Sequence, residues 1–423
     1  MNYIEKDSDF QQKLLNRFIK YVKIWTESNL EKADKGIIPS EEREFELAKQ
    51  LSAELTVMGL QEVQVTKDCY TYAYLSPSKG FENVPPFCLL AHIDTVEEVS
   101  GKDVKPIIYP SYDGTPIDLQ CNVRHDPKKD FALAEAAKNR ETIITADGTT
   151  LLGADDKAGI SEIMTCIEYL VSNPEIKHGK IEVVFSPDEE TGHGMDKVPL
   201  NLIKSKFAYT VDGGNIGELE TECFNACSAL VTFTGKSTHT GTARDGGMVN
   251  AVNIASRFVE SLPVRERPET TCGYEGFYAV LEMNGSVEQA SVSMILRDFS
   301  EEGMEGRIAA VKKLAEAAAL SFGGKYEVSF KEQYKNMKSG LEKNPSVVKN
   351  LVAAYEASGI KPVFVPVRGG TDGSRLTEMG IPTPNIFTGG HNYHGRYEWA
   401  SLEQMGAATD VLINLSRKIA ENK

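Results

Sequence analysis

Short apolar segments alternate with amphipathic segments along most of the chain. Four apolar segments, often β-branched, predict buried strands over residues 87–93, 181–186, 206–212 and 381–387. Apolar residues at helical spacing predict helices over residues 156–172 and 402–421. Strands that alternate with helices are typical of a sheet covered by helices on both faces. The pattern therefore predicts an α/β fold.

The middle of the chain has a different order of elements. The pattern predicts a strand, a helix, two strands, a helix and a strand, over residues 228–234, 247–261, 276–284, 289–298, 305–321 and 325–331. This β-α-β-β-α-β order is typical of a ferredoxin-like α+β domain. We therefore expect a discontinuous α/β domain of residues 1–223 and 336–423, into which a domain of residues 224–335 is inserted.

Composition and charge exclude several classes of partner. The 423 residues include 46 Lys and Arg against 61 Asp and Glu, a formal charge of −15. An acidic surface does not favour nucleic acid or anionic lipid, and no apolar run is long enough for a membrane helix. The N-terminal segment has no pattern of an export signal, and no cysteine pair has CxxC spacing. We therefore expect a cytoplasmic protein with reduced cysteines and with neither nucleic acid nor membrane as a partner.

Acids and histidines follow the predicted strands near the point where each strand ends. In doubly wound sheets these ends form the ligand-binding edge. A single acid in a turn is ordinarily a solvated cap, so the argument rests on recurrence. The chain has 7 histidines, and two of them belong to this set. The set comprises His92, Asp94, Asp155, Glu189, Glu190, Asp212 and His394.

Carboxylates that converge on one edge repel each other unless cations hold them. Carboxylates and imidazoles without cysteine suit zinc, manganese or cobalt. Two ions explain the set better than one, because two divalent ions are neutralised by three carboxylates and a hydroxide. Glu189 then remains as the free carboxylate and is the expected general base, which takes a proton from the metal-activated water.

Long motifs in a fixed order extend through nearly the whole chain: HIDT (92–95), TTLLGADDKAGISEIMT (149–165), PDEETGHG (187–194), YTVDGGNIGELE (209–220) and PNIFTGGHNYHGRYE (384–398). In these motifs the chain resembles the dinuclear zinc metallopeptidases of family M20, and it is most similar to a branch that acts on tripeptides. The resemblance implies a zinc-exopeptidase-like mixed sheet with an inserted lid domain. It also implies an aminopeptidase that releases the N-terminal residue from short peptides.

The resemblance implies a role for each metal ligand. Two Zn²⁺ ions are expected, and Mn²⁺ or Co²⁺ also fits the ligands. His92 and Asp212 would bind one ion, His394 and Glu190 the other, and Asp155 would bridge both.

Other roles carried by the resemblance concern catalysis and substrate. Asp94 would orient the imidazole of His92, Glu189 would be the base, and His239 would stabilise the oxyanion. The peptide bond after Asp155 is expected to be cis. Candidates for binding the peptide backbone and its carboxylate are Asn250, Arg297 and Arg368.

Alternatives remain open at this stage. A dipeptidase or an N-acyl-amino-acid deacylase would use the same metals on another substrate. A non-catalytic binding protein on a decayed peptidase scaffold would be marked by loss of Glu189 or of a ligand, and none is lost. Relatives often pair through the inserted domain, so a homodimer is an expectation that the resemblance alone carries.

Overall fold

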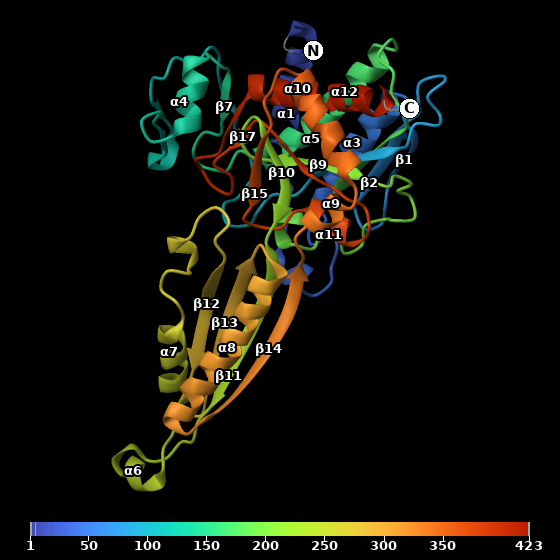
Figure 1. Ribbon diagram of the computed structural model, residues 1–423. Coiled ribbons are helices and arrows are strands. Elements are labelled where there is room, and N and C mark those ends of the chain that lie inside the picture. The colour runs from blue at the N-terminus through green and yellow to red at the C-terminus, as the bar shows by residue number, and fades with distance from the viewer. Residues whose placement is uncertain (1, 5, 422–423) are drawn as a thin grey trace. The chain divides into compact units, whose positions relative to one another are not determined.

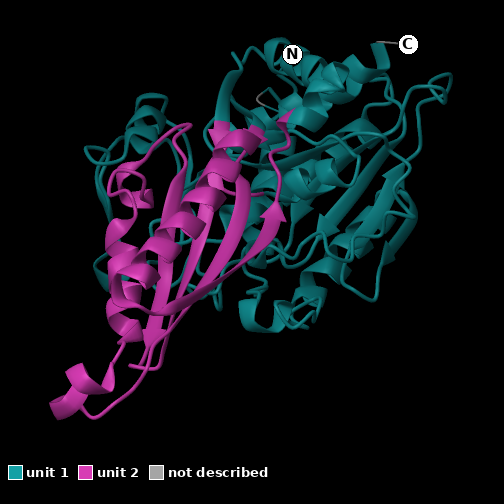
Figure 2. Cartoon of the chain, turned by 60° about the horizontal axis from the view of Figure 1, so that its bottom comes forward, with its two compact units in different colours: residues 1–221, 339–365, 371–423 teal, residues 222–338, 366–370 magenta. Residues whose placement is uncertain are grey.

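The computed structural model describes residues 2–4 and 6–421 (Figure 1). The chain forms two compact units (Figure 2). Unit 1 consists of Met1–Thr221, Ser339–Val365 and Thr371–Lys423, and unit 2 of Glu222–Lys338 and Pro366–Gly370. Within the described residues, no helix is both long enough and apolar enough to cross a membrane.

Unit 1 is built on an eight-stranded mixed sheet in the order β1-β2-β8-β3-β9-β16-β10-β15. In its centre β3 runs parallel to β8 and β9, and β9 runs parallel to β16. Antiparallel pairs lie outside this centre, between β1 and β2, β2 and β8, and β10 and β16. The strands are β1 (Gln61–Val65), β2 (Thr71–Leu75), β3 (Phe87–His92), β8 (Ile181–Ser186), β9 (Ala208–Gly213), β10 (Glu218–Cys223), β15 (Val363–Val367) and β16 (Asn385–Phe387). The predicted α/β class is confirmed.

Helices cover this sheet. Every residue of β3 and of β8 is buried, as in a strand covered on both faces. The long helix α5 packs on β3 and β9 and also contacts α1 and α12, while α3 packs on β1 and β2 and α11 on β9. The helices of unit 1 are α1 (Ser8–Tyr21), α2 (Leu30–Ala33), α3 (Glu44–Val57), α4 (Phe131–Lys138), α5 (Ala154–Ser172), α10 (Pro345–Ala357), α11 (Asp372–Glu378) and α12 (Leu402–Glu421), and α9 (Lys338–Glu342) begins at the unit boundary.

Short strands bring segments of unit 1 that are far apart in sequence side by side. The second sheet has the order β17-β18-β7-β4, and β5 pairs with β6. These strands are β4 (Ile107–Tyr109), β5 (Ile117–Asp118), β6 (Arg124–His125), β7 (Ile143–Thr145), β17 (Gly390–His391) and β18 (Trp399–Ser401). They are too short for a periodic pattern, and the sequence does not predict them.

Unit 2 is a four-stranded antiparallel sheet in the order β12-β13-β11-β14. Its elements are β11 (Asn225–Thr234), α6 (Ala243–Gly246), α7 (Ala251–Ser261), β12 (Phe277–Gly285), β13 (Gln289–Asp298), α8 (Glu301–Phe322) and β14 (Lys325–Tyr334). Apart from the short α6, this is the β-α-β-β-α-β order that the sequence pattern predicts. Side chains from α7, α8 and the strands share one core, which includes Phe233, Phe258, Val292 and Val311.

Several element boundaries differ from the prediction, and for two of them the sequence gives a local reason. The strand expected over residues 381–387 is limited to β16, because Pro382 and Pro384 have no N–H for ladder hydrogen bonds. The helix expected from residue 247 begins at Ala251, because the side chain of Asn250 accepts the Val252 N–H and caps the helix there.

Candidate metal centre

The acidic residues and histidines of unit 1 that the sequence predicts as metal ligands meet near the edge where β3, β8 and β9 end. His92 is the last residue of β3, and Asp212 is the penultimate residue of β9. Glu189 and Glu190 lie in the 3₁₀ turn Glu189–Thr191, which follows β8. Because these strands are parallel, their carboxyl ends lie at one edge, as expected for a ligand site in an α/β sheet.

Asp155 lies between two histidines that come from opposite ends of the chain. One carboxylate oxygen, Oδ1, is 2.8 Å from Nε2 of His92, and the other, Oδ2, is 3.2 Å from Nε2 of His394. Asp212 Oδ1 is 3.7 Å from Nε2 of His92, and Glu190 Oε2 is 3.2 Å from Nε2 of His394. The structure thus brings together all five residues that the sequence predicts as metal ligands.

Two overlapping sets of donor atoms could each hold a metal ion. The donor atoms of His92, Asp155 and Glu190 all lie within 4.8 Å of one another, and so do those of His92, Asp156 and Asp212. Nitrogen and oxygen donors of these kinds suit zinc and related divalent ions. Glu190 Oε1 is buried without a hydrogen-bond partner among the described residues, so it is available as a ligand. The residues present therefore fit a metal centre.

Asp94 is fully buried beside this cluster. It accepts the backbone N–H of Glu189 at Oδ1, over 3.0 Å, and that of Glu190 at Oδ2, over 3.2 Å. Nδ1 of His92 is 3.3 Å from Asp94 Oδ1, but the two atoms are not aligned as a hydrogen bond. Asp94 thus fixes the turn that carries both glutamates and lies against the imidazole that it is expected to orient.

The pKa shifts of these groups indicate that the cluster favours bound positive charge. Burial raises the pKa of Glu190 to about 8 and that of Asp212 to about 6. Burial also opposes ionisation of Asp155, but hydrogen bonds to His394 and His92 hold its pKa well below the usual range. Hydrogen bonds to Asp155 and Glu190 raise the pKa of His394 to about 11. Without metal the cluster therefore retains protons, and metal binding would displace them.

Two further carboxylates, for which the sequence alone indicated no role, belong to this region. Asp156 accepts the backbone N–H of His92 over 3.2 Å, and the peptide bond between Asp155 and Asp156 is cis, as the resemblance implies. Glu398 is buried and accepts the N–H groups of Leu152 and Gly153 over 2.8 and 2.7 Å. Asp156 could have been predicted from its position next to Asp155 in the sequence. Glu398 could not, because it binds backbone N–H groups that are far away in the sequence.

The remaining predicted site residues lie in unit 2. His239 is exposed, and its Nδ1 accepts the Gly241 N–H over 3.1 Å. Arg297 donates from Nη1 to Leu296 O and Gln333 Oε1, each over 3.0 Å. The guanidinium of Arg368 makes three hydrogen bonds, to the carbonyl oxygens of Gly273 and Glu275 and to Thr271 Oγ1.

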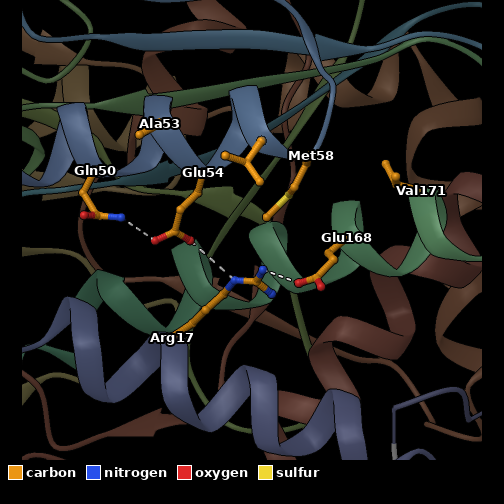
Figure 3. Close-up of a pocket in the computed structure, with 8 residues that line it drawn as sticks. Arg17, Gln50, Ala53, Glu54, Met58, Glu168 and Val171 are labelled. Atoms are coloured by element: carbon orange, nitrogen blue, oxygen red, sulfur yellow. Dashed lines mark hydrogen bonds and ion pairs between the residues drawn. The ribbon is translucent and has the colours of Figure 1, made fainter.

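A separate surface pocket of about 440 Å³ lies among α1, α3 and α5 (Figure 3). Arg17 crosses it and forms ion pairs with Glu54 and Glu168, and Gln50 donates to Glu54 over 2.7 Å. None of the candidate metal ligands is among the residues that line it. Arg17 thus joins α1 to α3 and α5 through its two ion pairs.

Comparison with known proteins identifies the family to which the chain belongs. The sequence pattern of "Peptidase family M20/M25/M40" matches residues 142–418. The chain therefore belongs to this peptidase family, as its motifs indicate. Among curated proteins it is similar to peptidase T of Clostridium perfringens, at 44% identity over 97% of this chain and 100% of that protein. Peptidase T of Geobacillus thermodenitrificans is 45% identical over 98% of this chain and 99% of that protein.

Solved structures confirm the fold. Aminopeptidase PepT from Bacillus cereus matches with a TM-score of 0.76 at 24% identity, over 97% of this chain and 99% of that chain. A tripeptidase from Staphylococcus aureus matches with a TM-score of 0.77 at 22% identity, over 97% of this chain and 99% of that chain.

Proposed function

We propose that this chain is a metal-dependent aminopeptidase that releases the N-terminal residue from short peptides, with tripeptides as the preferred length. Membership of the peptidase family and the similarity to peptidase T support this function. The observation that carries it is the position of Asp155, which directs one carboxylate oxygen to His92 and the other to His394. A carboxylate placed in this way suits a bridge between two cations.

The proposed cofactor is a pair of Zn²⁺ ions. His92, Asp212 and Asp155 would hold one ion, and His394, Glu190 and Asp155 the other. The contacts of His92 with Asp155 and Asp212, and those of His394 with Asp155 and Glu190, support this assignment. When bound, such ions polarise the scissile carbonyl and lower the pKa of the attacking water.

Glu189 is the proposed general base. Glu189 belongs to neither of the two sets of candidate metal ligands found among the described residues, although it is adjacent to Glu190 in the sequence. Its backbone N–H is held by Asp94, so the turn presents its carboxylate from a fixed position. In the proposed reaction Glu189 accepts a proton from the attacking water and then donates it to the leaving amine.

His239 is the proposed donor to the oxyanion. Because its Nδ1 accepts the Gly241 N–H, the neutral ring carries its proton on Nε2. That proton can stabilise developing negative charge, an effect of about 3 kcal/mol for one such donor.

Three residues of unit 2 are proposed to bind substrate. Nη1 of Arg297 donates hydrogen bonds within unit 2. The planar guanidinium group suits the two oxygens of a peptide carboxylate. Arg368 holds the segment 271–275, so it is the less available of the two arginines. Asn250 is proposed to contact the peptide backbone.

The decisive experiment separates metal binding from turnover. Glu189→Ala is expected to keep the metal content of the wild type and to lower kcat for a tripeptide by about 10²–10⁴-fold. Glu175→Ala, which changes an exposed glutamate, is the matched control and retains activity. A Glu189→Ala variant with near wild-type turnover would show that the base is another group.

A substrate panel tests the peptide length and the alternative substrates. Purified enzyme is assayed with dipeptides, tripeptides, tetrapeptides and N-acetylated amino acids. Preference for tripeptides supports the proposal, whereas preference for dipeptides or acetylated amino acids would indicate a dipeptidase or a deacylase on the same metal centre. We further propose that the enzyme acts in the cytoplasm, because its scattered cysteines suit a reducing compartment. On the resemblance alone, we propose that it pairs as a homodimer.

A further inference from the structure

The turn that carries His394 is the least protected part of the metal centre. The His394 side chain is 49% exposed, whereas that of His92 is 2% exposed. Asn392 and His394 have φ values of 56° and 61°, in the left-handed region that residues other than glycine rarely adopt. An exposed turn with two such residues needs support from neighbouring elements to keep one conformation.

Asp130, from a distant segment of unit 1, provides such support. Its Oδ2 accepts the Asn392 side-chain N–H over 2.8 Å and the Trp399 indole N–H over 3.0 Å. Its Oδ1 accepts the Leu133 N–H over 3.0 Å and caps α4. One carboxylate therefore joins the start of α4 to both sides of the loop that carries His394.

A second anchor holds the beginning of the same turn. The His391 ring stacks on Trp399, with ring centroids 4.0 Å apart and an interplanar angle of 21°. Nε2 of His391 lies 2.9 Å from Gln404 Oε1, and Gln404 donates to Glu141 over 2.9 Å. Residue 391 is thus fixed to α12. The Tyr393 hydroxyl donates to the Gly213 carbonyl oxygen over 3.0 Å and lies 2.9 Å from Thr388 Oγ1. Between these two anchored residues, the side chain of Asn392 is held by Asp130.

The charge on Asp130 strengthens this contact. Burial opposes its ionisation, but hydrogen bonds from Leu133, Asn392 and Trp399 hold the pKa of Asp130 below its usual value. Asp130 is therefore ionised at neutral pH, and its hydrogen bonds to Asn392 and Trp399 are charge-assisted. Such bonds are about twice as strong as neutral ones.

We propose that Asp130 is a positioning residue for His394, which it orients through Asn392, and that it sets the affinity of the metal position that His394 completes. The inference rests on the proposed function, because it takes His394 as a metal ligand. Asp130 touches neither metal nor substrate in this assignment. Loss of its contact with Asn392 would free the backbone at residue 392, and with it the direction in which the turn presents Nε2 of His394 to Asp155 and Glu190.

Asp130→Asn separates this role from the capping of α4. The amide oxygen of asparagine can still accept the Leu133 N–H, whereas its NH₂ group replaces the acceptor that faces Asn392 and Trp399. We expect affinity at one metal position to fall about 10–100-fold, the range for residues that support metal ligands, with the other position unchanged. Asp126→Asn is the matched control. Asp126 lies four residues before Asp130, and its side chain accepts the backbone N–H of Lys128.

A swapped pair provides the rescue. In Asp130→Asn/Asn392→Asp the new amide donates to the new carboxylate, so the contact between residues 130 and 392 is restored with its direction reversed. The Trp399 N–H remains without its acceptor, so the pair tests the contact with residue 392 alone. Aspartate, like asparagine, tolerates the left-handed conformation at position 392. Recovery of at least tenfold in metal affinity over Asp130→Asn would show that this contact, rather than general stability, controls the site.

The measurement is the zinc content and zinc affinity of the purified full-length chain, by elemental analysis and chelator competition, with circular dichroism to confirm folding. Two ions in the wild type and one in His394→Ala establish the reference. A weaker second ion in Asp130→Asn, with recovery in the swapped pair, supports the inference. Wild-type affinities in Asp130→Asn, or no recovery in the swapped pair, would overturn it. A wild type without bound metal would instead refute the proposed function.

Discussion

Glu398 accepts the backbone N–H of Asp155 over 3.0 Å, although 243 residues separate the two in the sequence. Its other oxygen accepts the N–H groups of Leu152 and Gly153. Gly153 has a φ of 81°, a conformation that glycine adopts without a steric penalty. A buried carboxylate thus fixes the bend from which Asp155 reaches both histidines.

Glu398→Gln is expected to weaken metal binding. Glutamine replaces one acceptor oxygen with an NH₂ group, which faces a backbone N–H and leaves it unsatisfied. Chelator competition should show about 10–100-fold lower zinc affinity, because Asp155 loses its fixed position. Glu403→Gln is the control, since Glu403 accepts the Thr142 N–H near the start of α12 and supports no metal ligand. Equal affinities in the two variants would contradict this role for Glu398.

The sequence predicted the centre of the sheet because β3 and β8 are buried on both faces and therefore read as continuous apolar runs. Parallel strands place their carboxyl ends at one edge of the sheet, so the sequence alone was enough to predict that His92 and Asp212 lie close together. The order of elements in unit 2 followed from helix and strand periodicity in the same way.

The supporting groups could not be predicted for an equally physical reason. Glu398 and Asp130 act through hydrogen bonds to residues more than 240 positions away, and such contacts impose no local pattern. The strands β4 and β7 have three residues each, which is too short for a period to show. The groups that carry the proposed chemistry were thus predictable from the sequence, whereas the groups that hold them in place were not.

Metal removal is expected to destabilise unit 1. The five candidate ligands converge in the folded state and are dispersed in the unfolded chain, so metal binds the folded form selectively. Each zinc ion at about 100 times its Kd should stabilise the folded state by about 2.7 kcal/mol. Thermal unfolding of chelator-treated protein, with and without added zinc, measures this effect.

The control for that experiment is a histidine outside the cluster. His193 lies on the surface and pairs with Asp196 and Asp34, so His193→Ala should keep the zinc-dependent rise in Tm. His92→Ala should lose most of it. A wild-type Tm that does not respond to zinc would argue against a metal centre.

Recognition of the substrate carboxylate can be assigned with amidated peptides. If Arg297 binds that carboxylate, C-terminal amidation of a tripeptide lowers kcat/KM of the wild type by about 10–100-fold, as for loss of a charged hydrogen bond. Arg297→Gln should then cleave the acid and the amide at similar, reduced rates. Arg257→Gln, which removes an exposed arginine paired with Glu260, should keep the wild-type preference. Loss of the preference in Arg368→Gln alone would assign the contact to Arg368.

A buried histidine far from the candidate ligands should make stability depend on pH. His178 is buried, and its Nδ1 lies 2.8 Å from the carbonyl oxygen of Gly179, to which the neutral ring donates. Burial lowers the pKa of His178 below its usual value. The unfolded chain, where a histidine titrates near ~6.5, therefore binds this proton more readily than the folded chain does. The stabilisation is complete above the unfolded pKa and is lost as the pH falls through the folded pKa.

His178→Asn tests this dependence, because asparagine can donate a similar hydrogen bond and does not titrate. Urea unfolding in the presence of a chelator, from pH 8 to pH 5, gives the free energy of unfolding of both proteins. The difference, wild type minus variant, should be constant above about pH 7.5 and should decrease below about pH 6.5, by at most ~1.4 kcal/mol per pH unit. Because both proteins contain the same carboxylates, their titration cancels in this difference. Parallel stability curves over the whole range would show that His178 protonates equally in the folded and unfolded chains.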